Sequence, residues 1–176
     1  AIATLPVLDP NSGDFLSTPI NAKEDKQSIN LTLDHQLNKH VTLSASYSHM
    51  KDKWKAKDGW TLGPESGWDS DDINTGINHL RPQNHYALNV SYENARFYTG
   101  LLLNYYTGCS GLAFTDNRFL ILDWNANYEF ANGITAYVTV GNLTNESYET
   151  SYNSWNGLGS SAMPGRYFMV GTKYKF

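Results

Sequence analysis

Large aromatic and basic side chains gather in one polar stretch of the chain, from about residue 55 to 82. Trp, Tyr and Arg are the residue types in which binding energy most often concentrates. We predict that these side chains, with two from later in the chain, face one ligand vestibule. The predicted ligand-binding residues are Trp54, Trp60, Trp68, His79, Arg81, Tyr106 and Trp155. The alternative that stays open is a loop that packs only on its neighbours.

Other chemically active residue types form no recognisable site. The five histidines are scattered, and Asp69, Asp71 and Asp72 lack the spacing of an EF-hand calcium loop. A single cysteine, Cys109, excludes a disulfide within the chain, and we interpret it as an incidental loop thiol. We therefore expect no catalytic residue, no metal site and no cofactor, and we expect that the chain is not an enzyme.

The elements that must position the predicted ligand residues are β-strands. In residues 41–48 apolar side chains alternate with Thr and Ser, and residues 86–93 and 120–130 repeat this period of two. Successive strand side chains point to opposite faces, so each run has one apolar and one polar face. The pattern predicts seven strands, at about residues 26–37, 40–54, 83–93, 96–107, 118–130, 134–143 and 166–176.

The connections between these strands alternate strictly in length. Tight turns at residues 37–40, 93–96 and 131–133 alternate with long loops at about 55–82, 108–117 and 144–165. Short turns on one side and long loops on the other are typical of outer-membrane barrels. A soluble sandwich gives no reason for loop lengths to segregate by end.

Strand length favours the membrane as well. No apolar run approaches the roughly 18 to 20 residues of a transmembrane helix, whereas the strands match the roughly 9 to 11 tilted residues that cross a bilayer. Tyr47, Tyr92 and Tyr128 fall near strand ends, where aromatic rings favour the membrane boundary. The net charge of −4 argues against nucleic acid as a partner. The predicted fold class is all-β, an antiparallel transmembrane β-barrel segment of about seven strands.

A run of basic residues continues the second predicted strand. If its alternation persists beyond Tyr47, these side chains project outward above the membrane: His49, Lys51, Lys53, Lys55 and Lys57. Lysine is a serviceable partner for phosphate. We predict a lipopolysaccharide contact at Lys51, Lys53, Lys55 and Lys57; the alternative is a solvated strand extension.

The last predicted strand ends on an aromatic residue. Phe168, Val170, Tyr174 and Phe176 share one face with Thr172, and Lys173 and Lys175 lie on the other. This arrangement resembles the terminal strand that the outer-membrane barrel-assembly machinery recognises. We predict that these four apolar residues form the assembly signal.

Three segments carry a family resemblance. Residues 142–148, Asn-Leu-Thr-Asn-Glu-Ser-Tyr, resemble the N-L-x-(D/N)-x-x-Y segment of TonB-dependent outer-membrane receptors. Pro164-Gly165-Arg166 is similar to the turn that opens their last strand, and residues 43–48 match one of their strands in style. The resemblance covers about residues 24–176.

The resemblance implies a 22-stranded barrel in the outer membrane of a Gram-negative bacterium, closed inside by an N-terminal plug. Such receptors import scarce nutrients such as ferric siderophores, haem or cobalamin, with energy from TonB. The implied partners are outer-membrane lipid and lipopolysaccharide, the rest of the barrel, the plug, TonB through that plug, and the assembly machinery. His79 or His85 as a haem-facing ligand stays open. No plug and no TonB-contacting segment are recognisable here.

We expect residues 1–25 to be an extracellular loop or disordered lead-in, and residues 26–176 to be C-terminal barrel strands. An open seven-stranded sheet leaves two unpaired edges, and each unsatisfied backbone group in hydrocarbon costs several kcal/mol. We therefore expect a fragment, or one part of a barrel that another chain completes. An eighth strand within residues 1–24 is the alternative, disfavoured by Pro6, Pro10 and Pro19.

Two other functions remain open on the sequence. One is an outer-membrane barrel enzyme, a protease or phospholipase, which needs Ser, His or Asp groups converging at a rim. The other is a small structural or adhesive barrel. The length of the full gene and the presence of a plug would separate both from a receptor.

Overall fold

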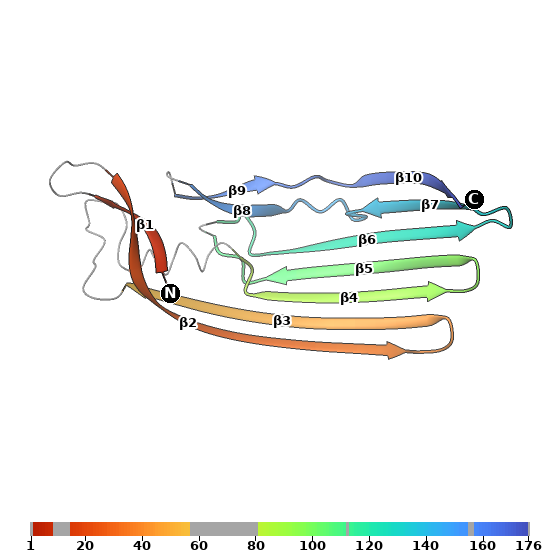
Figure 1. The fold of residues 1–176 in the computed structure, drawn as a ribbon, viewed down its shortest axis with the longest axis horizontal. Helices are drawn as coiled ribbons and strands as arrows, with labels where there is room; N and C mark the ends of the chain where they lie inside the picture. The colour runs from red at the N-terminus through yellow and green to blue at the C-terminus, as the bar shows by residue number, and fades with distance from the viewer. Residues whose placement is uncertain (1, 9–14, 57–80, 112, 155–156, 176) are drawn as a thin grey trace.

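The computed structural model describes residues 2–8, 15–56, 81–111, 113–154 and 157–175, with side chains in 25–51, 81–111, 113–151 and 159–175. Eight strands form one antiparallel sheet in the order β1-β2-β3-β4-β5-β6-β7-β10, and β8 and β9 form a separate hairpin (Figure 1). The strands are β1 (Ile2–Leu8), β2 (Phe15–Gln36), β3 (Val41–Ala56), β4 (Asn84–Glu93), β5 (Phe97–Thr107), β6 (Arg118–Glu129), β7 (Ile134–Gly141), β8 (Glu149–Ser154), β9 (Gly157–Ala162) and β10 (Tyr167–Tyr174). Within the described residues, no helix is long and apolar enough to span a membrane.

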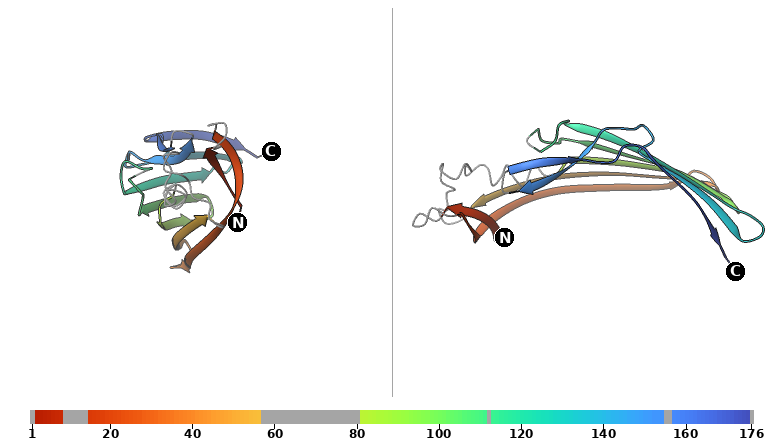
Figure 2. Two further views of the ribbon diagram at one scale, coloured as in Figure 1. Left: turned by 90° about the vertical axis from the view of Figure 1, so that its left-hand side faces the viewer. Right: turned by 90° about the horizontal axis from the view of Figure 1, so that it is seen from above.

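The seven predicted strands correspond to β2 to β7 and β10, so the predicted fold class is confirmed. The three tight turns lie together at one end of the sheet and the longer connections at the other (Figure 1). We call these the short-turn end and the long-loop end. The sheet is bent along its strands rather than flat (Figure 2), as expected from the twist of paired strands.

The beginning of the chain differs from expectation. Residues predicted as a loop or disordered lead-in form β1 and the first part of β2, which pair from Ile2↔Asn21 to Leu8↔Phe15. Pro6 and Pro19 lie inside this hairpin. They are tolerated because, among the described residues, β3 pairs with β2 only from Ala22 onward and no other strand pairs with the second edge of either proline. β1 thus extends the long-loop end and adds no strand along the membrane-length part of the sheet.

The two faces of the sheet differ as the alternation predicts. One face, here the apolar face, carries aliphatic side chains that are directly opposite across neighbouring strands, such as Leu88↔Leu103 and Leu103↔Leu122. These side chains stay exposed, Leu88 by 37% and Val170 by 76%. The other, here the polar face, carries mainly small polar side chains: Asn30, Thr32, Ser44, Ser46, Asn89, Ser91, Asn104, Asn125, Asn127 and Thr139.

Aromatic rings bracket the aliphatic part of the apolar face. Toward the long-loop end Tyr86 contacts the rings of Tyr47 and Tyr105, with centroids 4.8 and 6.0 Å away. Toward the short-turn end Tyr92 and Phe97 are 6.2 Å apart. Tyr86 and Tyr92 lie on one strand, and a rise of about 3.3 Å per residue separates them by roughly 20 Å. Such an apolar band between aromatic girdles is the exterior of a transmembrane barrel.

Each tight turn is closed by an asparagine side chain. Asn38 Oδ1 accepts hydrogen bonds from the backbone N–H groups of His40 and Val41, at 2.9 and 3.1 Å. Asn94 does the same for Arg96 and Phe97. Asn132 accepts from the N–H of Ile134 at 3.3 Å. These are local bonds of the kind that asparagine readily makes in turns.

The β7–β10 pairing contains two reciprocal tyrosine–glycine pairs on the polar face. Tyr167 is directly opposite Gly141, and Tyr137 is directly opposite Gly171. A Cβ added at either glycine would collide with the ring of its partner. Glycine is therefore required at both positions so that each ring can lie flat across the neighbouring strand.

Candidate functional site

Four rings from four segments stack in a row across the polar face at the long-loop end. His85 and Tyr106 are nearly parallel, with centroids 4.3 Å apart and 5° between their planes. Tyr106 stacks on Phe119 at 4.7 Å, and Phe119 on Tyr148 at 5.7 Å. We call His85, Tyr106, Phe119 and Tyr148 the aromatic stack.

Strand register positions the first three rings of the stack. His85 on β4 is directly opposite Tyr106 on β5, which is directly opposite Phe119 on β6. The ring Nε2 of His85 lies 2.9 Å from Asn104 Oδ1, which fixes the orientation of the imidazole. Direct cross-strand neighbours are close enough for aromatic rings to interact, so the pairing alone brings these side chains together.

The fourth ring, Tyr148, lies in the segment that follows β7. Asn142 is 2% exposed and has a positive φ of 50°. Its backbone N–H donates to Asp123 Oδ1, and its side-chain amide both donates to the carbonyl of Glu146 and accepts from the N–H of Glu146, all at 2.8 Å. The amide thus replaces a strand partner and turns the chain toward Tyr148. This gives a physical reason for the Asn at the start of the motif.

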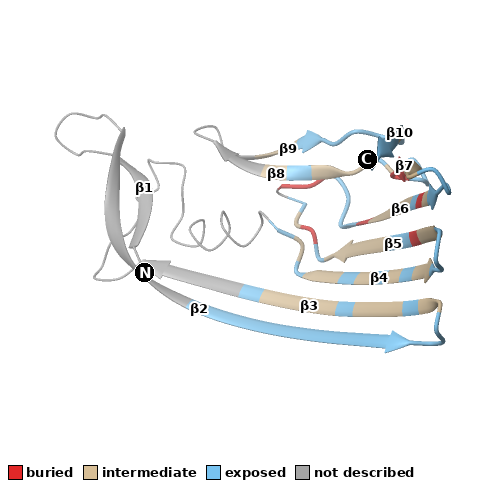
Figure 3. Ribbon diagram, turned by 45° about the vertical axis from the view of Figure 1, so that its right-hand side comes forward, coloured by how far each residue is buried: buried red, intermediate tan, exposed pale blue. Residues whose placement is uncertain are grey.

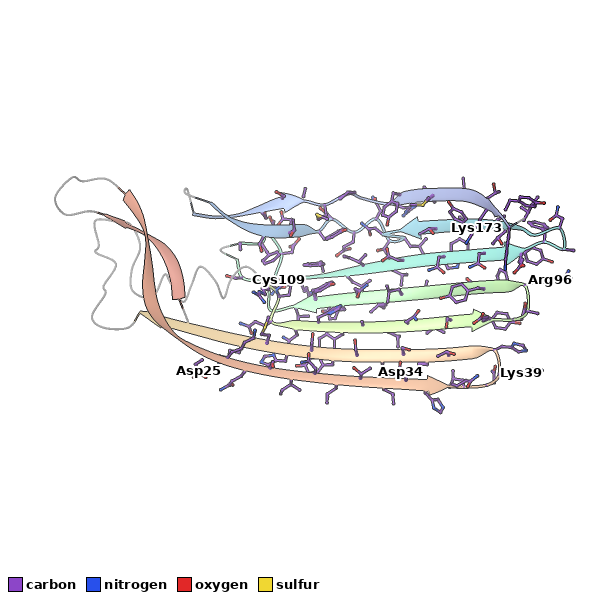
Figure 4. The ribbon with its side chains drawn as sticks, in the orientation of Figure 1. Asp25, Asp34, Lys39, Arg96, Cys109 and Lys173 are labelled. Carbon is purple, nitrogen blue, oxygen red and sulfur yellow. The ribbon has the colours of Figure 1, made fainter. Side chains whose placement is uncertain are left out.

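A small core supports the stack from the long-loop side. Cys109, Ala113, Phe114 and Phe119 are buried together, and Tyr106, Ile121 and Tyr148 pack against them. Figure 3 shows the buried segments in the connection between β5 and β6. Cys109 lies at the opposite end of the sheet from Lys39 and Arg96 (Figure 4). Cys109 lies in this connection, as the interpretation of a loop thiol expects, but it is only 5% exposed, and burial raises the pKa of its thiol.

Glu149 at the start of β8 holds this loop in place. The Thr115 N–H donates to Glu149 Oε2 and the Thr115 hydroxyl donates to Oε1, both at 2.8 Å. These hydrogen bonds, the backbone one first, lower the pKa of the Glu149 carboxyl. The carboxylate therefore stays ionised at neutral pH and ties two connections of the long-loop end together.

A cleft of about 70 Å³ opens beside the last two rings of the stack. Phe114, Thr115, Asp116, Phe119, Ser147, Tyr148 and Glu149 line it. Burial, followed by the nearby charge of Asp123, raises the pKa of the Tyr148 phenol. The cleft therefore combines aromatic surface, two carboxylates and a neutral phenol.

The structure brings one predicted ligand residue, Tyr106, into the stack. Arg81 is exposed, and its guanidinium lies 3.9 Å from the sulfur of Met50. The side chains of Trp54, Trp60, Trp68, His79 and Trp155 lie outside the described residues. Phe119 and Tyr148 were not among the predicted residues, and His85 was named only as an open haem-facing ligand. His85 and Phe119 lie at strand ends with the parity of the polar face.

The basic run follows the register that the sequence predicts. Lys51, Lys53 and Lys55 are opposite Gln27, Asp25 and Lys23, in phase with Tyr47 on the apolar face. Lys51 is exposed, and Lys57 lies outside the described residues. The ring Nδ1 of His49 lies 2.8 Å from Asn84 Oδ1.

The predicted assembly residues share the apolar face of β10. Phe168, Val170 and Tyr174 are opposite Val140, Val138 and Ile134. Phe176 falls outside the described part of the chain. As for metals, no group of three or more His, Cys, Asp or Glu able to hold an ion occurs among the described residues.

No family model and no curated protein matches the chain. Solved structures do match. The ferripyoverdine receptor of the outer membrane of Pseudomonas aeruginosa, bound to ferripyoverdine, aligns over 96% of this chain at 16% identity with a TM-score of 0.63. The chain has the fold of a TonB-dependent receptor barrel. The family resemblance that the sequence carries is thereby confirmed for the fold.

Two further structures give the same result. The FpvAI–pyocin S2 complex matches 96% of the chain at 17% identity with a TM-score of 0.63. FpvA of P. aeruginosa bound to a heterologous pyoverdine matches 96% at 17% identity with a TM-score of 0.62. This chain spans only 21% to 22% of the length of these receptors. The predicted outer-membrane location agrees with the matched fold.

Proposed function

We propose that the chain forms part of the wall of an outer-membrane transporter that imports a ferric siderophore or a similarly scarce nutrient. The observation that carries the proposal is the aromatic stack on the polar face at the long-loop end. The apolar face meets lipid, so the polar face lines the interior. A ligand arriving from outside then meets the partly buried rings of His85, Tyr106 and Tyr148 at the mouth, where flat rings give contact area at little conformational cost.

The proposed partners follow from the matched fold. In a closed barrel β10 and β2 pair with further strands, and small polar groups such as Ser44, Asn89 and Asn125 face a plug. Coupling to TonB through that plug supplies the energy, and the assembly machinery inserts the barrel through the β10 residues.

Matched tyrosines on one strand test the ligand site. Tyr106 and Tyr105 are neighbours on β5, but Tyr106 belongs to the stack and Tyr105 lies on the apolar face. Tyr106→Ala should lower uptake of radioactive ferric siderophore about fivefold, since an aromatic contact is worth about 0.5–1.5 kcal/mol. Tyr105→Ala should leave uptake unchanged. Cells that lack their own siderophore receptors and express the intact protein provide the assay, with ferripyoverdine as the first probe.

Each outcome bears on a different part of the proposal. No uptake of any ferric siderophore by the wild type, at normal outer-membrane levels, would contradict transport. Uptake unaffected by Tyr106→Ala would remove the stack from the ligand surface. Equal losses in both variants would show that the ring matters for folding rather than for the ligand.

The basic run supports a second contact, with lipopolysaccharide phosphates. Lys51 and the register positions of Lys53 and Lys55 are in phase with the lipid-facing Tyr47. Lys51→Glu, combined with Lys53→Glu, should lower the amount of lipopolysaccharide that copurifies with the intact protein. Lys173→Glu, on the polar face of β10, is the matched control. Equal lipopolysaccharide in all three proteins would exclude this contact.

A further inference from the structure

The cleft beside the stack has walls of opposite character. Phe114, Phe119 and Tyr148 line its aromatic side, where Phe114 and Phe119 are buried and Tyr148 is partly buried; Asp116 and Glu149 supply carboxylates. Among the described residues that line it, none is Lys, Arg or His. A surface that pairs the partly exposed ring of Tyr148 with negative charge suits a cationic group, because the face of an aromatic ring is itself electron-rich and attracts cations.

The two carboxylates are arranged differently. Both oxygens of Glu149 accept hydrogen bonds from Thr115, which fixes this charge in the wall. Asp116 is exposed, and among the described residues none donates a side-chain hydrogen bond to it. Asp116 therefore has free acceptor capacity, since an ionised carboxylate offers about four lone-pair sites.

Basic residues close in sequence do not neutralise the cleft. Arg118 begins β6 opposite Thr107, in phase with the apolar face, whereas its neighbour Phe119 belongs to the polar face. Asp123, which accepts from the backbone of Asn142, adds another negative charge close enough to raise the pKa of Tyr148 in the cleft wall. An anionic group entering here would meet like charges and lose affinity.

The size of the cleft limits what enters it. Whole-ligand pockets measure roughly 300–1,000 Å³, whereas this cleft measures about 70 Å³. It therefore accepts one functional group of a larger molecule. We propose that the cleft binds a cationic group, an ammonium or guanidinium, carried by the imported ligand. This inference rests on the proposed transport function and adds the charge of the group recognised.

Two probes of equal shape test the inference on the intact protein in detergent micelles. Benzamidinium carries the cationic head group, and benzamide is its neutral counterpart. Ligand-detected nuclear magnetic resonance titration should show benzamidinium binding about tenfold more tightly, in the range expected for a cation between an aromatic side chain and a carboxylate. Equal affinity for the two probes would overturn the inference.

Variants then locate the binding. Asp116→Asn should weaken benzamidinium about fivefold and leave benzamide unchanged, because it removes one charge from an exposed position. Glu129→Gln, an exposed carboxylate at the short-turn end of the polar face, should change neither probe. An unchanged benzamidinium affinity in Asp116→Asn, or an equal loss in Glu129→Gln, would contradict the site.

The test separates this inference from the transport proposal. Wild-type uptake of ferric siderophore together with equal binding of both probes would reject only the cationic subsite. Selective binding of benzamidinium without uptake of any ferric siderophore would reject transport and leave a cation-binding cleft.

Discussion

The two ends of the sheet are held by different kinds of contact. At the short-turn end each turn is closed by an asparagine that bonds two or three residues ahead, at Asn38, Asn94 and Asn132. At the long-loop end the bonds join distant segments, such as Asp123 with Asn142 and Thr115 with Glu149. The local hydrogen bonds determine where the strands reverse. The hydrogen bonds between distant segments hold loops against one another, and the candidate site lies at the long-loop end, where these bonds occur.

The largest expected effect is at Asn142, where the distant contacts converge. Asn142→Ala removes both side-chain bonds to Glu146 and forces alanine into a positive φ. The protein should lose about 2–5 kcal/mol of unfolding free energy, since an orphaned polar group costs about 1–3 kcal/mol and the left-handed backbone about 1–2. Urea unfolding in phospholipid micelles, followed by electrophoretic mobility, measures the loss.

A glycine variant separates the cost of backbone strain from the cost of losing the side-chain amide. Asn142→Gly relieves the backbone strain but still lacks the amide, so it should lie between the wild type and alanine. A loss below about 1 kcal/mol for Asn142→Ala would show that the turn does not depend on this side chain.

The next largest effect is expected at Gly171, which is directly opposite Tyr137 between β10 and β7. Gly171→Ala places a Cβ against the Tyr137 ring and should cost about 1–3 kcal/mol, as overpacking does. Adding Tyr137→Ala should recover part of this cost. Stability that Gly171→Ala leaves unchanged would show that the ring can move aside freely.

A smaller effect is expected at the short turns. Asn94→Ala removes the acceptor for the N–H groups of Arg96 and Phe97, but the turn is exposed and water can replace the bond. We expect a loss of about 1 kcal/mol, comparable to the loss of a helix N-cap. If Asn94→Ala destabilised the protein as much as Asn142→Ala, the distinction between the two ends would be lost.

The smallest effect is a pH dependence of the loop that ends at Arg118. The folded pKa of Glu149 lies below its ordinary value of 4.5, so its stabilising contribution is complete above that value and is lost as pH falls through the folded pKa. Hydrogen exchange of the peptide containing Thr115, corrected for intrinsic rates, should show weaker protection in acid. Glu149→Gln cannot titrate and should abolish this difference, while a difference that persists would assign it to another group.

Sequence periodicity predicted the strands and their faces well, because alternate residues of a two-faced strand meet apolar and polar surroundings and differ in polarity accordingly. Strands β4, β5 and β6 were placed within a residue or so, and their parity decided which side chains share a face. The length of β2 and its hairpin with β1 were not predicted. Pro6 and Pro19 argue against a strand, and the sequence does not show that each proline can lie on a strand edge without a pairing partner.

The candidate site was only partly predictable. Tyr106 was expected at the vestibule, whereas Phe119 and Tyr148 were not, although 29 positions separate these two rings that stack at 5.7 Å. The register between neighbouring strands brings His85, Tyr106 and Phe119 together. Sequence periodicity predicts the face on which a side chain lies, but not which residue of the next strand is opposite to it. Tyr148 depends on the bonds of Asn142, which no local pattern encodes.

The opposite environments of neighbouring strand residues are the central claim. Spin labels at Leu88→Cys and Asn89→Cys, each in a Cys109→Ala background of the intact protein in a phospholipid bilayer, test it through collision rates with oxygen and a water-soluble nickel complex. The ratio of the oxygen collision rate to the nickel collision rate should be high at position 88, which faces lipid, and lower at position 89. Equal ratios at the two positions, or the reverse order, would contradict the account.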